Sequence, residues 1–266
     1  MLCARSMLAM VGARVRELEA LLLPRACLGC ERRMPAADPS ACCALCRHRM
    51  RAITPPVCAR CGQPLDRWSL LLERGPGAPA GRGAGTDAAR CAFCREWPDA
   101  LAWAASAVWL DDGPARNLVH ALKYGGWRVA ADPMAARLVS AAGARLRACD
   151  VLVPVPLGRT RLRARGHNQA ALLARALSRR CGARVVEALQ RVRETGTQTR
   201  LGPAARRHNV QGAFAATGPR LDGARVALVD DVLTTGATLG AAAGALAALA
   251  PARIGAVTFA RALVPA

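Results

Sequence analysis

Four C-x-x-C pairs stand within the first hundred of the chain's 266 residues and constrain its fold more than any other feature. The pairs are Cys27 with Cys30, Cys43 with Cys46, Cys58 with Cys61, and Cys91 with Cys94. A C-x-x-C turn points two thiolates at one ion, and two such turns complete a closed tetrahedral site. Four turns therefore predict two metal ions, paired most simply in sequence order.

The spacing of these pairs favours zinc. Twelve residues separate Cys30 from Cys43, which suits a ribbon-type zinc site, and 29 residues separate Cys61 from Cys91. Part of the longer gap is the low-complexity run 73–90, which we interpret as a flexible insert between two knuckles. Disulfides would need an oxidising compartment, and a redox pair would need a single C-x-x-C in a βαβ context. An iron–sulfur cluster stays open on the ligands alone.

Positive charge is concentrated in one part of the chain. Lysine and arginine number 38 against 18 acidic residues, a net charge of +20. Residues 151–220 hold 14 arginines and two acids, so this segment alone carries +12. A phosphate ligand or a nucleic acid would explain the concentration, and an arginine-rich coding bias would leave the same residues as solvated surface. Lys123 is the only lysine. Either a compact ammonium is needed there, or one lysine remained by accident.

The N-terminal residues 1–24 predict a helix and no export signal. Charged residues interrupt the segment, and we interpret Val11–Leu23 as an amphipathic helix that Pro24 ends. No stretch of about 18 apolar residues is free of charges and turn-formers, so we expect no transmembrane helix. These features predict a cytoplasmic protein.

Strand and helix patterns alternate after Cys94. The expected strands are 102–110, 150–155, 224–229 and 253–260, and the expected helices are 114–123, 129–142, 168–180 and 236–250. This alternation predicts an α/β domain with a parallel sheet. We therefore divide the chain into an N-terminal helix at 1–24, a cysteine-rich module at 25–97 and an α/β domain at 98–266.

The segment ALVDDVLTTGATLG, residues 227–240, carries the most specific motif. An apolar strand ends in Asp230 and Asp231, and a short loop then leads into a helix. The loop residues are Thr234, Thr235, Gly236, Ala237 and Thr238. Carboxylates at the carboxyl end of a strand lie where open α/β sheets bind ligands, and the loop offers N–H groups and a helix N-terminus to a phosphate. The segment therefore predicts a sugar-phosphate site.

The same segment resembles the phosphoribosyl-pyrophosphate (PRPP) binding motif of type I phosphoribosyltransferases. Within that resemblance, Asp230 and Asp231 would hold the ribose hydroxyls, partly through Mg²⁺, as the catalytic acids. The loop 234–238 would hold the 5′-phosphate. The implied fold is a type I phosphoribosyltransferase-like parallel sheet with helices on both faces, preceded by a small cysteine-rich double zinc ribbon.

Three further segments resemble the ComF family, whose members join a double zinc ribbon to such a domain. Residues 154–170 match its R-x-x-x-R-G-F-N-Q block at Arg161, Arg165, Gly166, Asn168 and Gln169, with His167 in place of phenylalanine. Residues 193–214 match at Thr197, Gln198, Leu201, Arg206, Asn209 and Phe214. The segment HALKYGG, 120–126, matches the block that contains Lys123.

The family resemblance implies roles for these residues. The candidates for contact with pyrophosphate or DNA are Lys123, Arg161, Arg165, Asn168, Gln169, Thr197, Gln198 and Arg206. The loop expected after the strand 150–155, residues 154–166, lies where related enzymes bind pyrophosphate. Guanidinium groups such as those of Arg161 and Arg165 match phosphate oxygens in bidentate fashion. Asn168 and Gln169 fit a helix cap as well as a ligand contact.

The resemblance leaves several functions open. ComF-family members are associated with natural competence, which implies handling of imported single-stranded DNA together with DNA-uptake helicase or channel proteins. The alternative is a genuine phosphoribosyltransferase with an unidentified nucleobase or amine acceptor, because no residue set identifies the acceptor. PRPP could also tune DNA binding through reciprocal coupling, and redox sensing by the cysteine pairs is a more distant alternative.

Overall fold

The structure is a computed structural model that describes residues 25–35, 38, 40–65, 91–193 and 210–262. The helix expected at Val11–Leu23 and the candidate residues Thr197, Gln198 and Arg206 lie outside the described residues.

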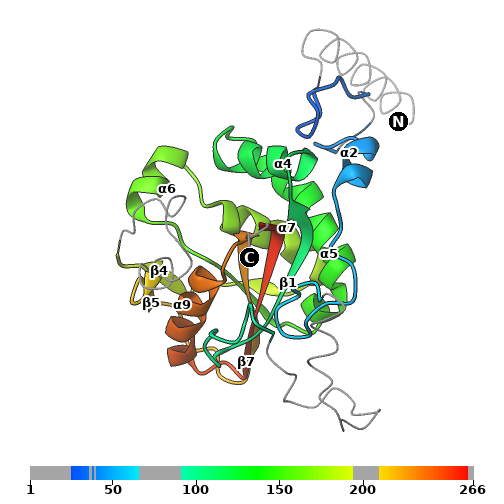
Figure 1. The fold of residues 1–266 in the computed structure, drawn as a ribbon. Coiled ribbons are helices and arrows are strands. Elements are labelled where there is room, and N and C mark those ends of the chain that lie inside the picture. The colour runs from blue at the N-terminus through cyan, green and yellow to red at the C-terminus, as the bar shows by residue number, and fades with distance from the viewer. Residues whose placement is uncertain (1–24, 36–37, 39, 66–90, 194–209, 263–266) are drawn as a thin grey trace, which may run out of the picture.

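A five-stranded parallel sheet forms the centre of the molecule (Figure 1). The strand order is β1-β7-β6-β2-β3, and every neighbouring pair runs parallel. The strands are β1 (Leu101–Leu110), β2 (Val151–Pro154), β3 (Arg184–Val185), β6 (Arg225–Leu233) and β7 (Arg253–Ala262). The four strands expected from the sequence are thus present in one sheet, which confirms the α/β class.

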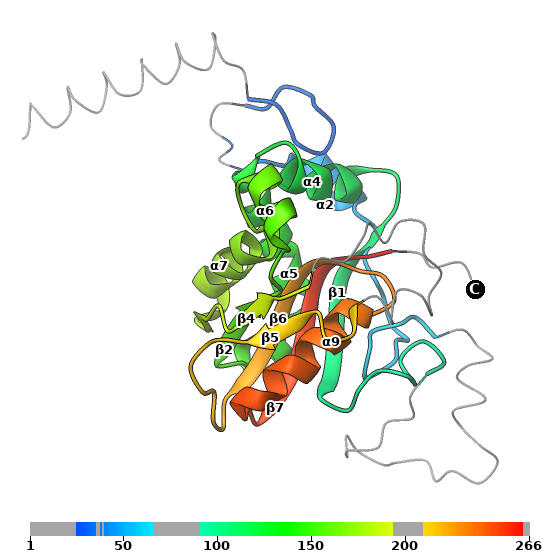
Figure 2. The same cartoon turned by 90° about the vertical axis from the view of Figure 1, so that its left-hand side faces the viewer.

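Helices cover both faces of this sheet, as expected (Figure 2). One face packs against α4 (Pro114–Lys123), α5 (Ala131–Arg147) and α7 (Gln169–Cys181), and the other packs against α9 (Ala237–Leu246). Alternate residues of β6 supply the two cores, because successive strand side chains point to opposite faces. Ala227 and Val229 join the core with α5 and α7, and Val226 and Leu228 join the core with α9.

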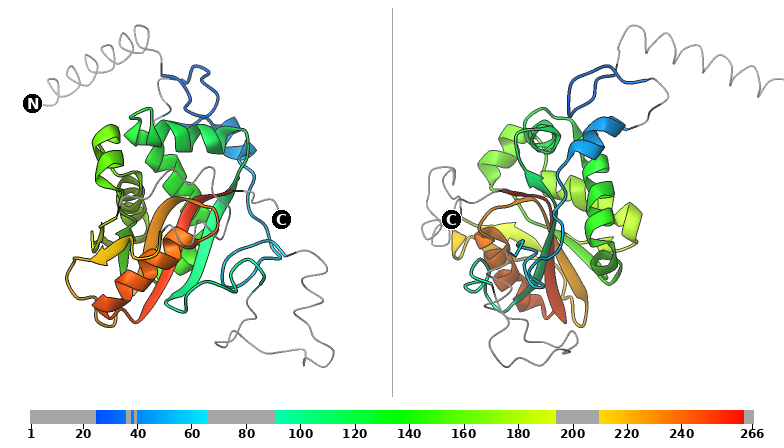
Figure 3. Two further views of the ribbon diagram at one scale, coloured as in Figure 1. Left: turned by 60° about the vertical axis from the view of Figure 1, so that its left-hand side comes forward. Right: turned by 45° about the vertical axis from the view of Figure 1, so that its right-hand side comes forward.

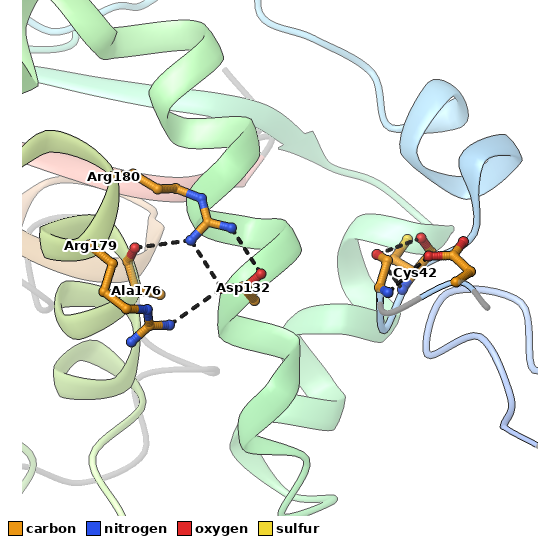
Figure 4. Close-up of polar contacts among 7 residues, drawn as sticks. Cys42, Asp132, Ala176, Arg179 and Arg180 are labelled. Atoms are coloured by element: carbon orange, nitrogen blue, oxygen red, sulfur yellow. Dashed lines mark hydrogen bonds and ion pairs between the residues drawn. The ribbon is translucent and has the colours of Figure 1, made fainter. Parts of the chain in front are cut away.

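Arginines at the end of α7 connect it to the start of α5 (Figure 4). Asp132, in the first turn of α5, accepts hydrogen bonds from Arg179 at 3.3 Å and from Arg180 at 2.8 and 3.0 Å. Hydrogen bonding and charge from Arg180, then Arg179, hold the pKa of the Asp132 carboxyl below its usual range. Because the Asp132 side chain is half exposed, this cluster connects the two helices but adds little to the free energy of unfolding.

Two local expectations were wrong. Strand β6 continues through both acids to Leu233, because Val232 and Leu233 extend its apolar pattern. The segment 154–166, expected as a loop, contains helix α6 (Arg159–Arg165), which begins after Gly158 and ends at Gly166 with φ of 70°. This helix buries none of its residues, so it has no apolar periodicity for the sequence to show.

Short elements complete the fold. They are α2 (Ala44–Arg49), the 3₁₀ helices η1 (Arg128–Ala130) and η3 (Ala247–Leu249), and the antiparallel pair β4 (Leu189–Arg191) and β5 (Phe214–Ala216). The helix expected at 129–142 is thus η1 followed by the longer α5, and the helix expected at 236–250 is α9 followed by η3.

The cysteine-rich segment runs along the edge of the sheet (Figure 3). Ala52 pairs with Val108 in an antiparallel bridge, and the Trp109 N–H donates to the Arg51 carbonyl at 2.9 Å. This pairing covers the outer edge of β1, which would otherwise offer unpaired N–H and C=O groups to another chain.

Strands β1 and β7 fit together through a large and a small residue. Trp103 of β1 is buried and lies opposite Gly255 of β7 in the register. A Cβ added to Gly255 would overlap the Trp103 indole ring. The Arg145 guanidinium lies over the same ring, 5.2 Å from its centroid, so the ring is held on its other side and cannot easily move away.

We therefore expect Gly255→Ala to lower the free energy of unfolding by about 2–3 kcal/mol, through overpacking against Trp103. The matched control is Gly244→Ala in α9, where an added Cβ meets nothing within 4 Å. That change is expected to raise the stability by about 0.5–1 kcal/mol. Chemical denaturation measures both, and equal effects of the two substitutions would contradict this description of the sheet.

Candidate functional site

The order of the strands creates a topological switch point between β2 and β6. The chain leaves β2 toward α6 and α7, on one face, and leaves β6 toward α9, on the other. The two connections therefore diverge at the carboxyl ends of neighbouring strands, near Pro154 and Leu233. Such a switch point is where open α/β sheets bind their ligands, and the acidic motif lies on β6 at this point.

Asp231 is buried in a polar cluster on the side of α4 and α7. Its side chain is 5% exposed, and its Oδ2 lies 2.5 Å from Nζ of Lys123. Gln169 donates from Nε2 to Asp231 Oδ1 at 3.4 Å. The single lysine of the chain, the acidic motif and the R-G-H-N-Q segment thus meet at one carboxylate.

The electrostatics of the two acids differ strongly. Burial alone would raise the pKa of Asp231, but the charge of Lys123 and several hydrogen bonds hold that pKa below its usual range. Burial likewise opposes the charged form of Lys123, yet the neighbouring Asp231 carboxylate raises the pKa of this lysine above its ordinary value. Asp231 and Lys123 therefore stay charged together as an ion pair across the neutral pH range.

Within the part of the chain that the structure describes, Asp230 has no cation in contact with its carboxylate. Its pKa is raised well above the ordinary value, first by burial and then by the charge of Asp231. Its Oδ1 accepts the Asp231 N–H at 2.8 Å, and strand alternation points its side chain away from the Lys123 side. A cation or a hydroxyl donor that approached this carboxylate would stabilise its charged form and lower its pKa.

The loop Thr234–Thr238 connects β6 to the N-terminus of α9. Gly236 is the N-cap of α9 and has a φ of 82°, a left-handed conformation that glycine adopts readily. The Ala237 N–H points to Oγ1 of Thr235 at 3.4 Å, and Thr238 lies in the first turn of α9. Threonine hydroxyls and a helix N-terminus thus stand beside the acids, an arrangement suited to a phosphate.

The segment 165–169 is bound to the end of α4. Arg165 donates to Gln169 Oε1 at 3.0 Å, and its guanidinium lies 4.8 Å from the centroid of the Tyr124 ring. His167 is buried, and its Nε2 lies 2.7 Å from the Leu122 carbonyl oxygen. The histidine therefore makes a polar contact with the last turn of α4, where a phenylalanine would only pack.

Asn168 and Arg161 occupy different surroundings. Asn168 is the N-cap of α7, because its Oδ1 accepts the Ala170 N–H at 3.0 Å, and its Nδ2 donates to the Val155 carbonyl at 3.1 Å. Of the two functions open for this residue, the structure shows the cap. Arg161 is half-buried on α6.

The eight paired cysteines form two four-thiol clusters. Cys27, Cys30, Cys43 and Cys46 form the first, and Cys58, Cys61, Cys91 and Cys94 form the second, with all Sγ atoms of a cluster within 4.8 Å of one another. Close Sγ pairs lie 3.5–3.9 Å apart. Ligands about 2.3 Å from a tetrahedral zinc ion would be roughly 3.8 Å apart. The clusters therefore fit two structural zinc sites, paired in sequence order as expected.

Other cysteines behave as structural thiols. Burial raises the pKa of Cys42 to about 12 and that of Cys149 to about 11. Ser40 and Cys42 exchange two hydrogen bonds beside the first cluster. These thiols are therefore protonated at neutral pH.

Each zinc ribbon contacts a different part of the site. In the first, Asn117 of α4 donates to the Gly29 carbonyl at 2.9 Å, and a Cβ on Gly29 would lie 3.2 Å from Pro114. In the second, Trp97 donates from Nε1 to the Thr235 carbonyl at 3.0 Å. The first ribbon therefore supports the helix that ends in Lys123, and the second contacts the loop Thr234–Thr238.

Sequence reasoning missed some of these residues. Trp97 is buried, and no local sequence pattern links it to Thr235, 138 residues away. Trp127 is 56% exposed, because it lies in the turn between α4 and η1. Tyr124, the only tyrosine, follows Lys123 directly and is 64% exposed.

Comparison with known families agrees with this architecture. Residues 18–75 match the double zinc ribbon domain, and residues 166–264 match the phosphoribosyl transferase domain. A purine phosphoribosyltransferase from Pyrococcus horikoshii is a structural neighbour at 19% identity, with a TM-score of 0.31 over 52% of this chain and 84% of that one. The parallel sheet and the family match define a type I phosphoribosyltransferase-like α/β protein with an N-terminal double zinc ribbon.

Curated relatives narrow the family further. The chain is 42% identical to competence protein F of Haemophilus influenzae over 98 residues, which are 36% of this chain and 43% of that protein. It is 36% identical to the DNA utilization protein YhgH of Escherichia coli K12 over 132 residues, 47% of this chain and 58% of that protein. The chain thus spans about half the length of the curated relatives it matches. The two matched domains and these two relatives together support the resemblance to the ComF family.

Among the described residues, no helix has the length and apolar character needed to cross a membrane.

The buried ion pair leads to a prediction on stability. We expect Lys123→Met to lower the free energy of unfolding at neutral pH by about 3 kcal/mol, because it leaves a buried carboxylate without its cation. The pKa of Asp231 is lowered in the folded protein and that of Lys123 is raised. The pair's contribution is therefore complete between the unfolded-state values of about 3.9 and 10.4, and is lost as pH falls or rises through the folded values.

Denaturation of the wild type and Lys123→Met across pH measures this difference, with Lys123→Arg as the charge-retaining control. The difference should shrink at acid pH below the ordinary aspartate value. A stability difference that does not change with pH would show that Lys123 contributes packing and not charge.

Proposed function

We propose that this chain binds PRPP with Mg²⁺ at the switch point between β2 and β6. We also propose that it takes part in handling imported single-stranded DNA in the cytoplasm. The observation that supports PRPP binding best is the position of Asp230, Asp231 and the loop Thr234–Thr238 at the switch point of the sheet. We further propose that the double zinc ribbon spans residues 25–97 and the phosphoribosyltransferase-like domain residues 98–266.

The two acids have different roles in this proposal. Asp230, whose pKa is raised, is the carboxylate available to ribose hydroxyls and to Mg²⁺, which prefers oxygen ligands. Asp231 is paired with Lys123, so its contribution is to fix the lysine and the strand end. The loop 234–238 holds the 5′-phosphate through its N–H groups and hydroxyls. Arg161 and Arg165 lie after β2, on the side where the pyrophosphate would extend.

A second function, binding of single-stranded DNA, is favoured by the surface beside α7. Two adjoining cavities of about 330 and 410 Å³ share Arg128, Leu172 and Arg175 among their lining residues. Trp127, next to Arg128, is 56% exposed. Exposed aromatic rings stack with bases, and arginines neutralise the backbone. Arg175 pairs with Glu187 at 3.2 Å, and both side chains are more than half exposed, so a phosphate can compete for the arginine.

The names of the two curated relatives support a role in DNA handling. One is called a competence protein and the other a DNA utilization protein. The first zinc ribbon borders the same surface, because Ala41 lines the cavity that Arg128 and Arg179 also line. A DNA strand in this groove would therefore pass between the ribbon and the α/β domain. DNA-uptake helicase or channel proteins are the partners this role would require.

The alternative is a genuine phosphoribosyltransferase. PRPP binding is common to both possibilities, and the described residues contain no set that specifies an acceptor base or amine. Pyrophosphate release on addition of a nucleobase or amine to the protein with Mg²⁺–PRPP would support the transferase. The DNA-handling role requires no such turnover.

Calorimetric titration of Mg²⁺–PRPP into the zinc-loaded protein tests the proposed site. We expect saturable binding by the wild type and its loss in Asp230→Asn, with the unfolding free energy unchanged or higher. The stability should not fall because Asp230 has a raised pKa, so its charge costs folding energy at neutral pH.

The matched variant Asp231→Asn should instead lower the stability, because it leaves the Lys123 ammonium without its partner. Binding by Asp230→Asn equal to that of the wild type would contradict the assigned site. Absence of binding by the wild type would contradict the function.

Fluorescence anisotropy with a labelled oligothymidylate tests the DNA surface. We expect Trp127→Ala to weaken binding by about fivefold to hundredfold, the value of one stacked base. Arg128→Ala should reduce the slope of log affinity against log salt by about 0.7. The control is Arg220→Ala, an exposed arginine of the β5–β6 turn that pairs with Asp222 at 2.6 Å. Unchanged affinity in Trp127→Ala would contradict the proposed surface.

A further inference from the structure

Trp97 forms a direct contact between the second zinc cluster and the phosphate loop. It follows the zinc-ligand residue Cys94 by three positions, and its side chain is buried. Its indole N–H donates to the Thr235 carbonyl at 3.0 Å. A Cβ added to Gly236 would overlap the indole ring. The ring therefore occupies the space next to the one loop residue that has a left-handed backbone.

The next residue, Pro98, makes a second contact with the same helix. A Cβ on Gly240 would lie 3.0 Å from Cδ of Pro98. Gly236 and Gly240 are four residues apart, and residues at that spacing lie on one face of a helix. The start of α9 thus presents a face without side chains, and the segment Trp97–Pro98 fills it.

Buried arginines fix this segment to the zinc cluster. Arg60 lies between the ligands Cys58 and Cys61 and is 8% exposed. Its Nη1 donates to the Cys94 carbonyl at 2.8 Å, and its Nη2 donates to the carbonyls of Pro98 and Leu101 at 2.9 and 3.0 Å. Arg60, which lies in the Cys58–Cys61 turn, therefore holds the segment that follows Cys94.

Arg261 connects the cluster to the sheet. It is 1% exposed on β7, and its Nη1 donates to the Cys61 carbonyl at 2.9 Å. Its guanidinium lies 4.2 Å from the centroid of the Phe93 ring, and Phe93 meets the Trp97 ring edge to face at 5.7 Å. Arg261 also pairs in the register with Leu233, the residue before the phosphate loop. The cluster, Trp97 and the strand end thus form one connected set of contacts.

We propose that the zinc site of Cys58, Cys61, Cys91 and Cys94 positions the loop Thr234–Thr238 through Trp97, so that PRPP affinity depends on this zinc ion. This inference rests on the proposed function of the loop. The loop must hold its left-handed turn at Gly236 before a phosphate arrives, and a preorganised site avoids the cost of ordering it on binding. Trp97 is a positioning residue, because it contacts the outer side of the loop and no reacting atom.

The test compares Trp97→Phe with Trp103→Phe in the zinc-loaded full chain. Both tryptophans are buried against a glycine, Trp97 against Gly236 and Trp103 against Gly255. Only Trp97 contacts the loop. Phenylalanine removes the indole N–H that bonds to Thr235, and the loss of one such bond is worth about 1 kcal/mol. We therefore expect Trp97→Phe to weaken Mg²⁺–PRPP binding by about fivefold, and Trp103→Phe by less than twofold.

Amide hydrogen exchange of residues 234–240 gives a readout that needs no ligand. We expect faster exchange there in Trp97→Phe and in Cys91→Ser, which removes one thiolate from the second cluster, and unchanged exchange in Trp103→Phe. Zinc content is measured on each sample. If Trp97→Phe does not fold, Arg60→Lys carries the test, because the three donors of a single ammonium nitrogen cannot replace the bonds that two separate guanidinium nitrogens of Arg60 make to four carbonyls.

Faster loop exchange with weaker PRPP binding supports the inference. Unchanged loop exchange in Trp97→Phe, or in Cys91→Ser that has lost one zinc ion, overturns it. If the wild type itself does not bind PRPP, the proposed function fails, and the exchange data still decide whether the zinc site holds the loop.

Discussion

The buried pair of Lys123 and Asp231 is the interaction on which the rest of the site depends. A carboxylate that is 5% exposed cannot stay charged without a cation, and the end of α4 supplies that cation. Gln169 and Arg165 continue the contacts to the R-G-H-N-Q segment. Three segments far apart in the sequence are therefore held at the carboxyl ends of β2 and β6. Among the described residues no cation contacts Asp230, which is why this acid is the one we propose to meet Mg²⁺ and the ribose hydroxyls.

The two zinc ribbons pack directly against helices of the α/β domain. The first ribbon lies against α4 through Gly29 and Asn117, and the second lies against α9 through Trp97 and Pro98. Each ribbon is a short segment that buries little apolar area of its own, so a metal ion must hold its shape. Once held by its metal ion, each ribbon supports a different element beside the switch point: the first supports α4 and the second supports the start of α9. This arrangement gives a structural reason for joining a double zinc ribbon to a phosphoribosyltransferase-like sheet.

The sequence predicted the parts of the fold that depend on local pattern. The apolar strands, the four C-x-x-C pairs and the acidic motif all carry short-range signals, and the structure contains them at the expected places. The exposed helix α6 was missed because it buries none of its residues. The extension of β6 to Leu233 was missed because two acids interrupt the apolar run before Val232 and Leu233. Contacts such as Trp97 with Thr235 and Arg261 with Cys61 were beyond prediction, since they depend on how distant segments pack. The isolated lysine did indicate a special position, and its partner Asp231 became evident only in three dimensions.

A crystal structure of the zinc-loaded protein with Mg²⁺ and PRPP tests the central claim most directly. The account predicts the 5′-phosphate on the loop Thr234–Thr238, the ribose hydroxyls and Mg²⁺ at Asp230, and an intact Lys123–Asp231 pair. A ligand bound elsewhere, or a ligand that displaces Lys123 and takes Asp231 as its main contact, would contradict it.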